Sequence, residues 1–116
     1  MNILIVDDEE LILKCLQDMV NKCSDSKALA VMTVPEAMDI LQGNDIHLVV
    51  TDYSLPNHGG ETIAKHCLKH KIPCIVASGY TRENMTGISP ETEVVDKLGS
   101  CKAMLNYITA SEKTTR

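Results

Sequence analysis

The stretch that decides the fold is NILIVDD, residues 2–8, in which a continuous apolar run ends in two carboxylates. Three later stretches follow the same pattern: LVVTD at 48–52, CIVAS at 74–78 and VVDK at 94–97. Short runs without polar alternation are typical of parallel strands whose two faces are both covered by helices. Each run therefore predicts a buried strand with a polar, chemically useful residue at or just beyond its C-terminal end.

Helical patterns separate the strands. One helix is predicted from apolar residues that recur at helical spacing, namely Leu11, Cys15, Leu16, Met19 and Val20. In chain order we expect strands at about 2–7, 28–32, 46–51, 74–77 and 93–96, and helices at about 9–22, 35–43 and 61–70. A last helix is indicated by the apolar stripe Ala103, Met104, Tyr107 and Ile108. The tail, 111–116, is expected to fray. Within 80–93, Gly87 and Pro90 leave room only for a short helix at about 82–86.

Alternating strands and helices predict an α/β fold with a parallel sheet and right-handed crossovers. For five βα units the flavodoxin-like order 2-1-3-4-5 is favoured, with helices on both faces and a short or irregular fourth helix. We expect one domain over residues 1–116. Ligands of such sheets bind where the strand order reverses, between strands one and three, and these strands carry Asp7, Asp8 and Asp52.

Composition narrows the class of protein. The formal charge is −5, the pI is near 5.2, and no basic run is present, so direct binding to nucleic acid is not expected. No apolar run has the length of a membrane span or the form of a signal peptide, so we expect a cytoplasmic protein that does not insert into membranes. The five cysteines include no C-x-x-C pair, and most are expected to be small buried hydrophobes.

Three carboxylates in one crevice repel one another unless protons or a cation compensate. Oxygen ligands suit a hard divalent ion, and Mg²⁺ combines one or two carboxylates with waters and phosphoryl oxygens. A carboxylate also acts as a nucleophile toward phosphorus when a metal and a fixed cation screen its charge. Lys97 can supply that fixed charge, and the Ser78 hydroxyl can donate a hydrogen bond to a phosphoryl oxygen.

Over nearly its whole length the chain resembles the receiver domain of two-component response regulators. The resemblance rests on Asp7-Asp8-Glu9, on TDYSLP at 51–56, on Ser78-Gly79 and on Lys97, in this order on five βα units. It implies that Asp52 is the phosphoacceptor, that Asp8 and Asp52 ligate Mg²⁺ directly with the Ser54 backbone carbonyl, and that Asp7 acts mostly through water. Ser78 and Lys97 would contact the phosphoryl group.

The same resemblance implies a role in a phosphorelay. The phosphodonor would be a histidine kinase or a histidine phosphotransfer protein, and the output would pass to a downstream protein target. Such a chain is a phosphorylation-controlled switch that assists its own phosphorylation and dephosphorylation through an aspartyl phosphate. It is not a classical enzyme.

The sequence departs from the family at two positions. Leu98 stands where receiver domains usually have proline after a cis peptide, and a trans peptide is predicted because a cis bond before a non-proline residue costs about 2.5–4 kcal/mol. Val94 stands where an aromatic switch residue is common. We therefore predict that phosphorylation orders or shifts the 80–93 segment instead of turning an aromatic ring.

Other interpretations stay open at this point. Asp7 and Asp8 also suit the start of a helix, whose positive end acidic residues stabilise. Phosphatases of the haloacid dehalogenase superfamily also have an aspartyl nucleophile after a strand, but they place a second Asp where this chain has Ser54. A receiver-like interaction module that is never phosphorylated is the remaining alternative. His66 and His70, four residues apart, predict a solvated face more strongly than a zinc site, and His58 is a weaker candidate for controlling access to the crevice.

Overall fold

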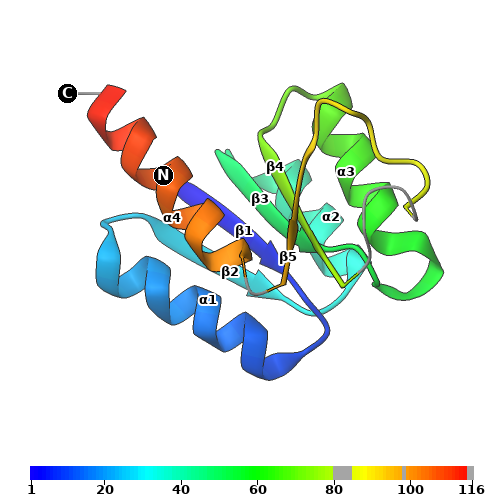
Figure 1. Cartoon of the computed structure of the whole chain (residues 1–116), viewed down its shortest axis with the longest axis horizontal. Helices are drawn as coiled ribbons and strands as arrows, with labels where there is room; N and C mark the ends of the chain where they lie inside the picture. Colours follow the sequence, from blue (N-terminus) through cyan, green and yellow to red (C-terminus); the bar gives the residue numbers. More distant parts are fainter. Residues whose placement is uncertain (80–84, 98, 115–116) are drawn as a thin grey trace.

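Five parallel strands form one sheet in the order β2-β1-β3-β4-β5 (Figure 1). The computed structural model describes residues 1–79, 85–97 and 99–114, with side chains described as far as Ser111. The strands are β1 (Asn2–Val6), β2 (Lys27–Val31), β3 (Leu48–Asp52), β4 (Cys74–Ser78) and β5 (Glu93–Asp96). The order, the parallel pairing and the alternation with helices confirm the predicted fold class.

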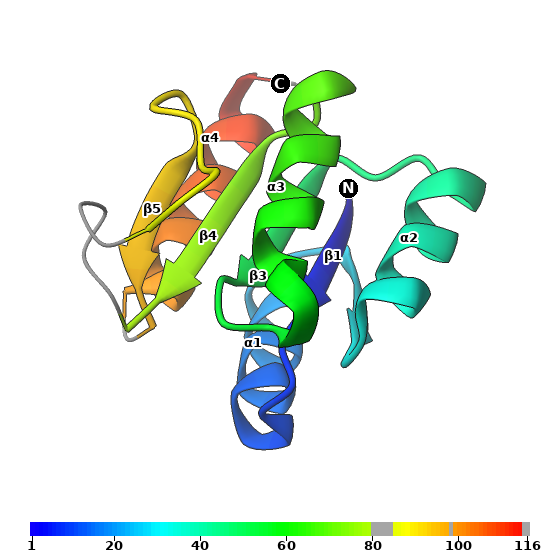
Figure 2. The ribbon, with the colours of Figure 1, turned by 90° about the vertical axis from the view of Figure 1, so that its right-hand side faces the viewer.

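Helices cover both faces of the sheet (Figure 2). They are α1 (Glu10–Cys23), α2 (Val34–Gly43), α3 (Gly59–Lys69) and α4 (Ser100–Thr114), with a short 3-10 turn, η1 (Pro56–His58), before α3. Ile3 and Ile5 face a core that α1 and α4 complete, whereas Leu4 and Val6 face a second core beneath α2 and α3. This alternation follows from the two-residue period of a strand, and it explains why the whole of β1 is apolar.

The loop between β3 and α3 lies very close to the end of β3. A Cβ atom at Gly60 would stand 2.5 Å from the backbone oxygen of Asp52 and 2.5 Å from the Cα of Tyr53. Glycine is therefore required at this position by close approach, because any side chain would push α3 away from the strand end. Asp52 and Tyr53 are thus held by the first turn of α3.

Several boundaries and burial predictions were wrong. The third strand runs from Leu48 to Asp52 instead of 46–51, α3 begins at Gly59 instead of 61, and α4 continues to Thr114 beyond the expected start of fraying. Leu11 is 81% exposed, and the buried stripe of α1 is Leu13, Leu16 and Val20. Among the cysteines only Cys67 is fully buried, while Cys15 and Cys23, both on α1, are exposed.

Two predictions fall partly or wholly outside the described residues. The Lys97–Leu98 peptide includes residue 98, and the short helix expected at 82–86 lies mostly within 80–84; neither residue 98 nor 80–84 is described. Residues 85–92 contain turns but neither helix nor strand. In the described part of the chain, no helix combines the length and apolar character needed to cross a membrane.

Candidate functional site

The C-terminal ends of four neighbouring strands bring the predicted site residues to one edge of the sheet. Val6 pairs with Thr51, so that Asp7 follows β1 beside the end of β3, where Asp52 is the last strand residue. Asp52 pairs with Ala77, and Ser78 pairs with Asp96, which precedes Lys97. The parallel register therefore gathers positions that are far apart in the sequence.

Three carboxylates form a cluster at this edge. Asp7, Asp8 and Asp52 each offer an oxygen, and these oxygens lie within 4.8 Å of one another. Asp7 is 3% exposed and Asp52 is 2% exposed, whereas Asp8 lies at the exposed mouth. Two buried acids and one accessible acid form a donor set that fits a hard divalent cation with some water ligands. This donor set fits Mg²⁺, and the individual ligand roles stay predictions.

Asp7 is held in a position that disfavours its charge. Its Oδ1 accepts a hydrogen bond from the Glu9 N–H at 2.8 Å. Burial raises the pKa of Asp7 above its usual value; the Glu9 N–H opposes this change, and the negative charge of Asp52 adds to it. The cluster is therefore electrostatically unfavourable without a counter-ion, because both burial and like charge disfavour ionised carboxylates.

Lys97 supplies a fixed positive charge at the site. Its Nζ donates hydrogen bonds to Asp52 Oδ2 at 3.1 Å and to Glu9 Oε1 at 2.6 Å, and it lies 3.8 Å from Asp7 Oδ2. Burial alone would lower the pKa of Lys97, but the bonds to Glu9 and Asp52 together with the charges of Asp52 and Asp7 raise it above its usual value. The ammonium group therefore stays protonated at neutral pH.

The remaining predicted residues lie around Asp52. Asp52 Oδ1 accepts a hydrogen bond from the Ser54 N–H at 3.1 Å, so both oxygens of this carboxylate have a donor. Ser78 is buried at the end of β4, one residue past the partner of Asp52. The roles of Ser78 and of the Ser54 carbonyl stay predictions. Glu9, for which no separate role was predicted, forms an ion pair with Lys97 at 2.6 Å.

The alternatives from the sequence are less well supported. α1 begins after Glu9 and has no side-chain cap, so neither Asp7 nor Asp8 caps this helix. The rings of His66 and His70 lie with their centroids 4.3 Å apart, but they belong to no group of three possible metal ligands in the described part of the chain. The exposed His58 lies 4.0 Å from Glu61.

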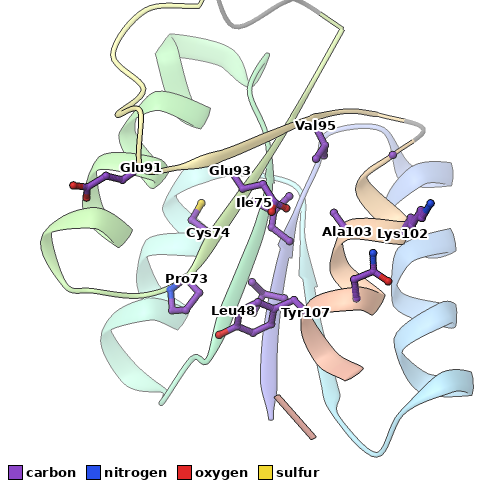
Figure 3. A pocket seen from close by; sticks show the side chains of 12 residues that line it. Leu48, Pro73, Cys74, Ile75, Glu91, Glu93, Val95, Lys102, Ala103 and Tyr107 are labelled. Carbon is purple, nitrogen blue, oxygen red and sulfur yellow. The ribbon is translucent and has the colours of Figure 1, made fainter. Parts of the chain in front are cut away.

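A large cavity lies away from the acids. It measures about 790 Å³ between β4, β5 and α4, and Figure 3 shows Leu48, Ile75, Val95 and Tyr107 around it. None of the three clustered carboxylates lines this cavity. The acidic cluster is therefore separate from this cavity.

Comparison with known proteins agrees with this fold. The family model of the response regulator receiver domain matches residues 3–99, and the chain belongs to this family. Receiver domains are the signalling switches of two-component systems. A search of curated protein sequences finds no significant match.

Solved structures of receiver domains share the fold. The receiver domain of the Francisella response regulator 1452 is 19% identical with a TM-score of 0.79, over 99% of this chain and 98% of that one. The non-phosphorylated receiver domain of RcsB from Escherichia coli is 21% identical with a TM-score of 0.74, over 98% and 94%. The chain spans only 60% of the RcsB response regulator of Salmonella typhimurium, at 19% identity, TM-score 0.77 and 98% coverage of this chain.

Proposed function

We propose that this receiver domain accepts a phosphoryl group on Asp52 from a phosphohistidine, in a Mg²⁺-dependent step that switches a signalling output. One observation carries the proposal: the Lys97 ammonium lies 3.1 Å from Asp52 Oδ2, in a cluster whose three carboxylates lie within 4.8 Å of one another. This is the combination of nucleophile, fixed cation and metal ligands that transfer of a phosphoryl group to a carboxylate needs.

The transfer balances with the residues present. An oxygen of the Asp52 carboxylate attacks phosphorus, the P–N bond of the phosphohistidine breaks, and its electron pair goes to the imidazole nitrogen, which takes up a proton from water. Lys97, already bonded to Asp52 Oδ2, neutralises charge on the incoming phosphoryl oxygens. Ser78, at the end of the neighbouring strand, would donate a hydrogen bond from its hydroxyl to one of these oxygens. Positioning and charge neutralisation supply the catalysis.

Asp7, Asp8, Asp52 and the Ser54 backbone carbonyl would hold Mg²⁺. When bound, this ion neutralises negative charge on donor and acceptor and orients phosphoryl oxygens. Asp8 and Asp52 would bind it directly, and the buried Asp7 would act mostly through water. Asp7 is already fixed by the Glu9 N–H at 2.8 Å, so its second oxygen is directed without further ordering.

A histidine kinase or a histidine phosphotransfer protein would supply the phosphoryl group, and a downstream protein target would read the result. The cytoplasmic location expected from the sequence would place the chain beside such a donor. Water would hydrolyse the aspartyl phosphate and reset the switch. The exposed Ser54 and Gly79 flank the site and leave space for that water.

The test is incubation with acetyl phosphate and Mg²⁺, followed by intact mass measurement. The wild-type chain should gain one phosphoryl group that is stable to acid and labile to base. Asp52→Asn should gain none, while the matched surface variant Asp18→Asn, on the exposed side of α1, should behave as wild type. Absence of an adduct on the wild-type chain would favour the alternative, a receiver-like interaction module that is never phosphorylated.

A further inference from the structure

Tyr53, which follows Asp52 directly, reaches across the molecule to Thr86. Its hydroxyl accepts a hydrogen bond from the Thr86 N–H at 3.0 Å and donates to the Thr86 carbonyl oxygen at 3.3 Å. The Thr86 hydroxyl lies 3.5 Å from the same oxygen. Both closer contacts involve the main chain of Thr86, so they fix the backbone at this position whatever its side chain.

A second contact holds the same turn. Gly87 has a φ of +74°, and its Cα lies directly against the side chain of Glu61, which would collide with a Cβ atom there. Glu61 in turn binds Lys65 at 2.9 Å and is 19% exposed. The turn at Thr86 and Gly87 is therefore docked between the residue after the phosphoacceptor and the first turn of α3.

The hydrogen bonds between the Tyr53 hydroxyl and the Thr86 main chain, here called the tether, are linked through the backbone to Asp52. The main chain of Tyr53 is fixed by the bond from its N–H to the Ala77 oxygen at 2.8 Å. On the other side, the Ser54 N–H that donates to Asp52 Oδ1 at 3.1 Å belongs to the peptide unit that begins at the carbonyl of Tyr53. A change in the hydrogen bonds that the Asp52 carboxylate accepts would therefore act on the peptide between Tyr53 and Ser54. The Tyr53 ring would carry this change to Thr86.

We propose that Tyr53 is the coupling residue that transmits the phosphorylation state of Asp52 to the segment 85–92. This inference rests on the proposed function and specifies its output. Formation of a bond between Asp52 and phosphorus converts one carboxylate oxygen into a bridging oxygen, so the bonds from Lys97 and Ser54 must rearrange. The peptide after Tyr53 then changes its orientation. As a result, the two hydrogen bonds between the Tyr53 hydroxyl and Thr86 are strengthened or released.

The location of the tether explains how a chain with Val94 in β5 can still signal. Val94 offers no hydroxyl or ring that could report on the site, whereas Tyr53 offers both one residue after Asp52. Residues 85–92 contain no helix or strand, so few regular backbone bonds oppose a shift of the segment. Two hydrogen bonds are enough to bias such an element between two positions.

The experiment is amide hydrogen exchange of residues 85–92, measured on the unmodified chain and on the chain phosphorylated with acetyl phosphate and Mg²⁺. In the unmodified protein, Tyr53→Phe should exchange the Thr86 amide about five- to twentyfold faster, because one to two hydrogen bonds are lost. In the wild-type protein, phosphorylation should change exchange across 85–92 severalfold. In Tyr53→Phe that response should fall below twofold, although intact mass shows the same phosphoryl adduct.

Two controls separate the tether from general effects. Tyr107→Phe makes the same chemical change on α4 and should leave exchange of the Thr86 amide as in wild type. Thr86→Ala keeps both main-chain contacts and should also respond normally. If the wild-type chain forms the adduct without any change at 85–92, or if Tyr53→Phe responds as wild type does, the coupling role is wrong. If no adduct forms on the wild-type chain, the proposed phosphoacceptor function itself is overturned, and the coupling with it.

Discussion

Replacing Asp7 by Asn should stabilise the metal-free protein and weaken its stabilisation by Mg²⁺. Asp7 is 3% exposed, and burial, followed by the charge of Asp52, raises its pKa. An Asn side chain keeps an oxygen for the Glu9 N–H, which bonds Asp7 Oδ1 at 2.8 Å, and it removes the buried charge. The proposed metal-binding role of Asp7 therefore opposes its effect on stability, a trade-off that functional sites often show.

The separations at the site set the size of the effect. At the 4.8 Å limit of the cluster, two carboxylates repel by about 0.9 kcal/mol in water and by about 3.5 kcal/mol at an effective dielectric constant of about 20. Attraction to Lys97 at 3.8 Å is about 1.1 and about 4.4 kcal/mol under the same conditions. These pair energies nearly cancel, so burial of the charge decides the sign. Removing that charge should stabilise by about 0.5–2 kcal/mol, the usual gain from relieving such a site.

Thermal unfolding with and without Mg²⁺ measures this prediction. A gain of that size corresponds to about 2–8 °C in Tm for a domain near this length. With Mg²⁺ at about 100 times its Kd, the wild-type chain should gain about 2.7 kcal/mol and become the more stable protein. The pKa of Asp7 is higher in the folded protein than its unfolded value near 3.8. The favourable contribution of Asp7 to folding stability is therefore complete below pH 3.8 and is lost as the pH rises through the pKa of the folded state. The advantage of Asn should therefore grow with pH. A metal-free Asp7→Asn chain that melts below wild type at neutral pH would refute the reasoning.

Two further predictions concern Lys97 and Gly60. Lys97→Met should slow adduct formation with acetyl phosphate by about 10²–10³-fold, the usual effect of losing one preorganised hydrogen-bond donor. The control Lys102→Met, at an exposed position of α4, should react at the wild-type rate. Equal rates for the two variants would show that Lys97 takes no part in the reaction. Gly60→Ala should lower stability in chemical denaturation by about 1–3 kcal/mol, because its Cβ would meet the Asp52 oxygen at 2.5 Å. Gly43→Ala, with no atom within 4 Å, should be neutral or stabilising, and similar losses for both variants would contradict the packing argument.

The sheet and the position of the acids could be predicted because each depends on a short local pattern. Apolar runs with no polar alternation identify strands buried on both faces, and a parallel sheet brings every strand end to one edge. Asp7, Asp52 and Lys97 were therefore placed together without knowledge of any distance. At the start of α2, residues 33–36 have the Thr-x-x-Glu pattern of a capping box: the Thr33 hydroxyl accepts a hydrogen bond from the Glu36 N–H at 3.4 Å and donates one to the Glu36 carboxylate at 2.8 Å.

Other features depend on packing that no local pattern specifies. In α1 the run ELILKCL, residues 10–16, is apolar on more than one side, so the spacing of Leu11 fitted a helix face as well as that of Leu13. Packing of α1 against β1 and α4 determines which side of the helix is buried: Leu13 lies in the core, and Leu11 is 81% exposed. The contact between Tyr53 and Thr86 joins positions 33 residues apart, with no spacing rule to announce it. Such contacts depend on tertiary structure alone.

The charge balance of the site supports the proposed requirement for a metal in addition to Lys97. Asp7, Asp8, Glu9 and Asp52 carry four formal negative charges against one positive charge on Lys97, whose Nζ contacts three of the four, which leaves a formal −3. A phosphoryl donor brings further negative charge toward this edge, and repulsion at such separations opposes its approach. A divalent ion reduces the formal charge to −1. Glu9 would contribute to this proposed requirement, because it binds Lys97 at 2.6 Å and would have to release the ammonium to the phosphoryl oxygens. Glu9→Gln should therefore weaken the hold on Lys97 and lower the Mg²⁺ concentration needed for half-maximal adduct formation, and an unchanged Mg²⁺ dependence would show that Glu9 has no part in the balance.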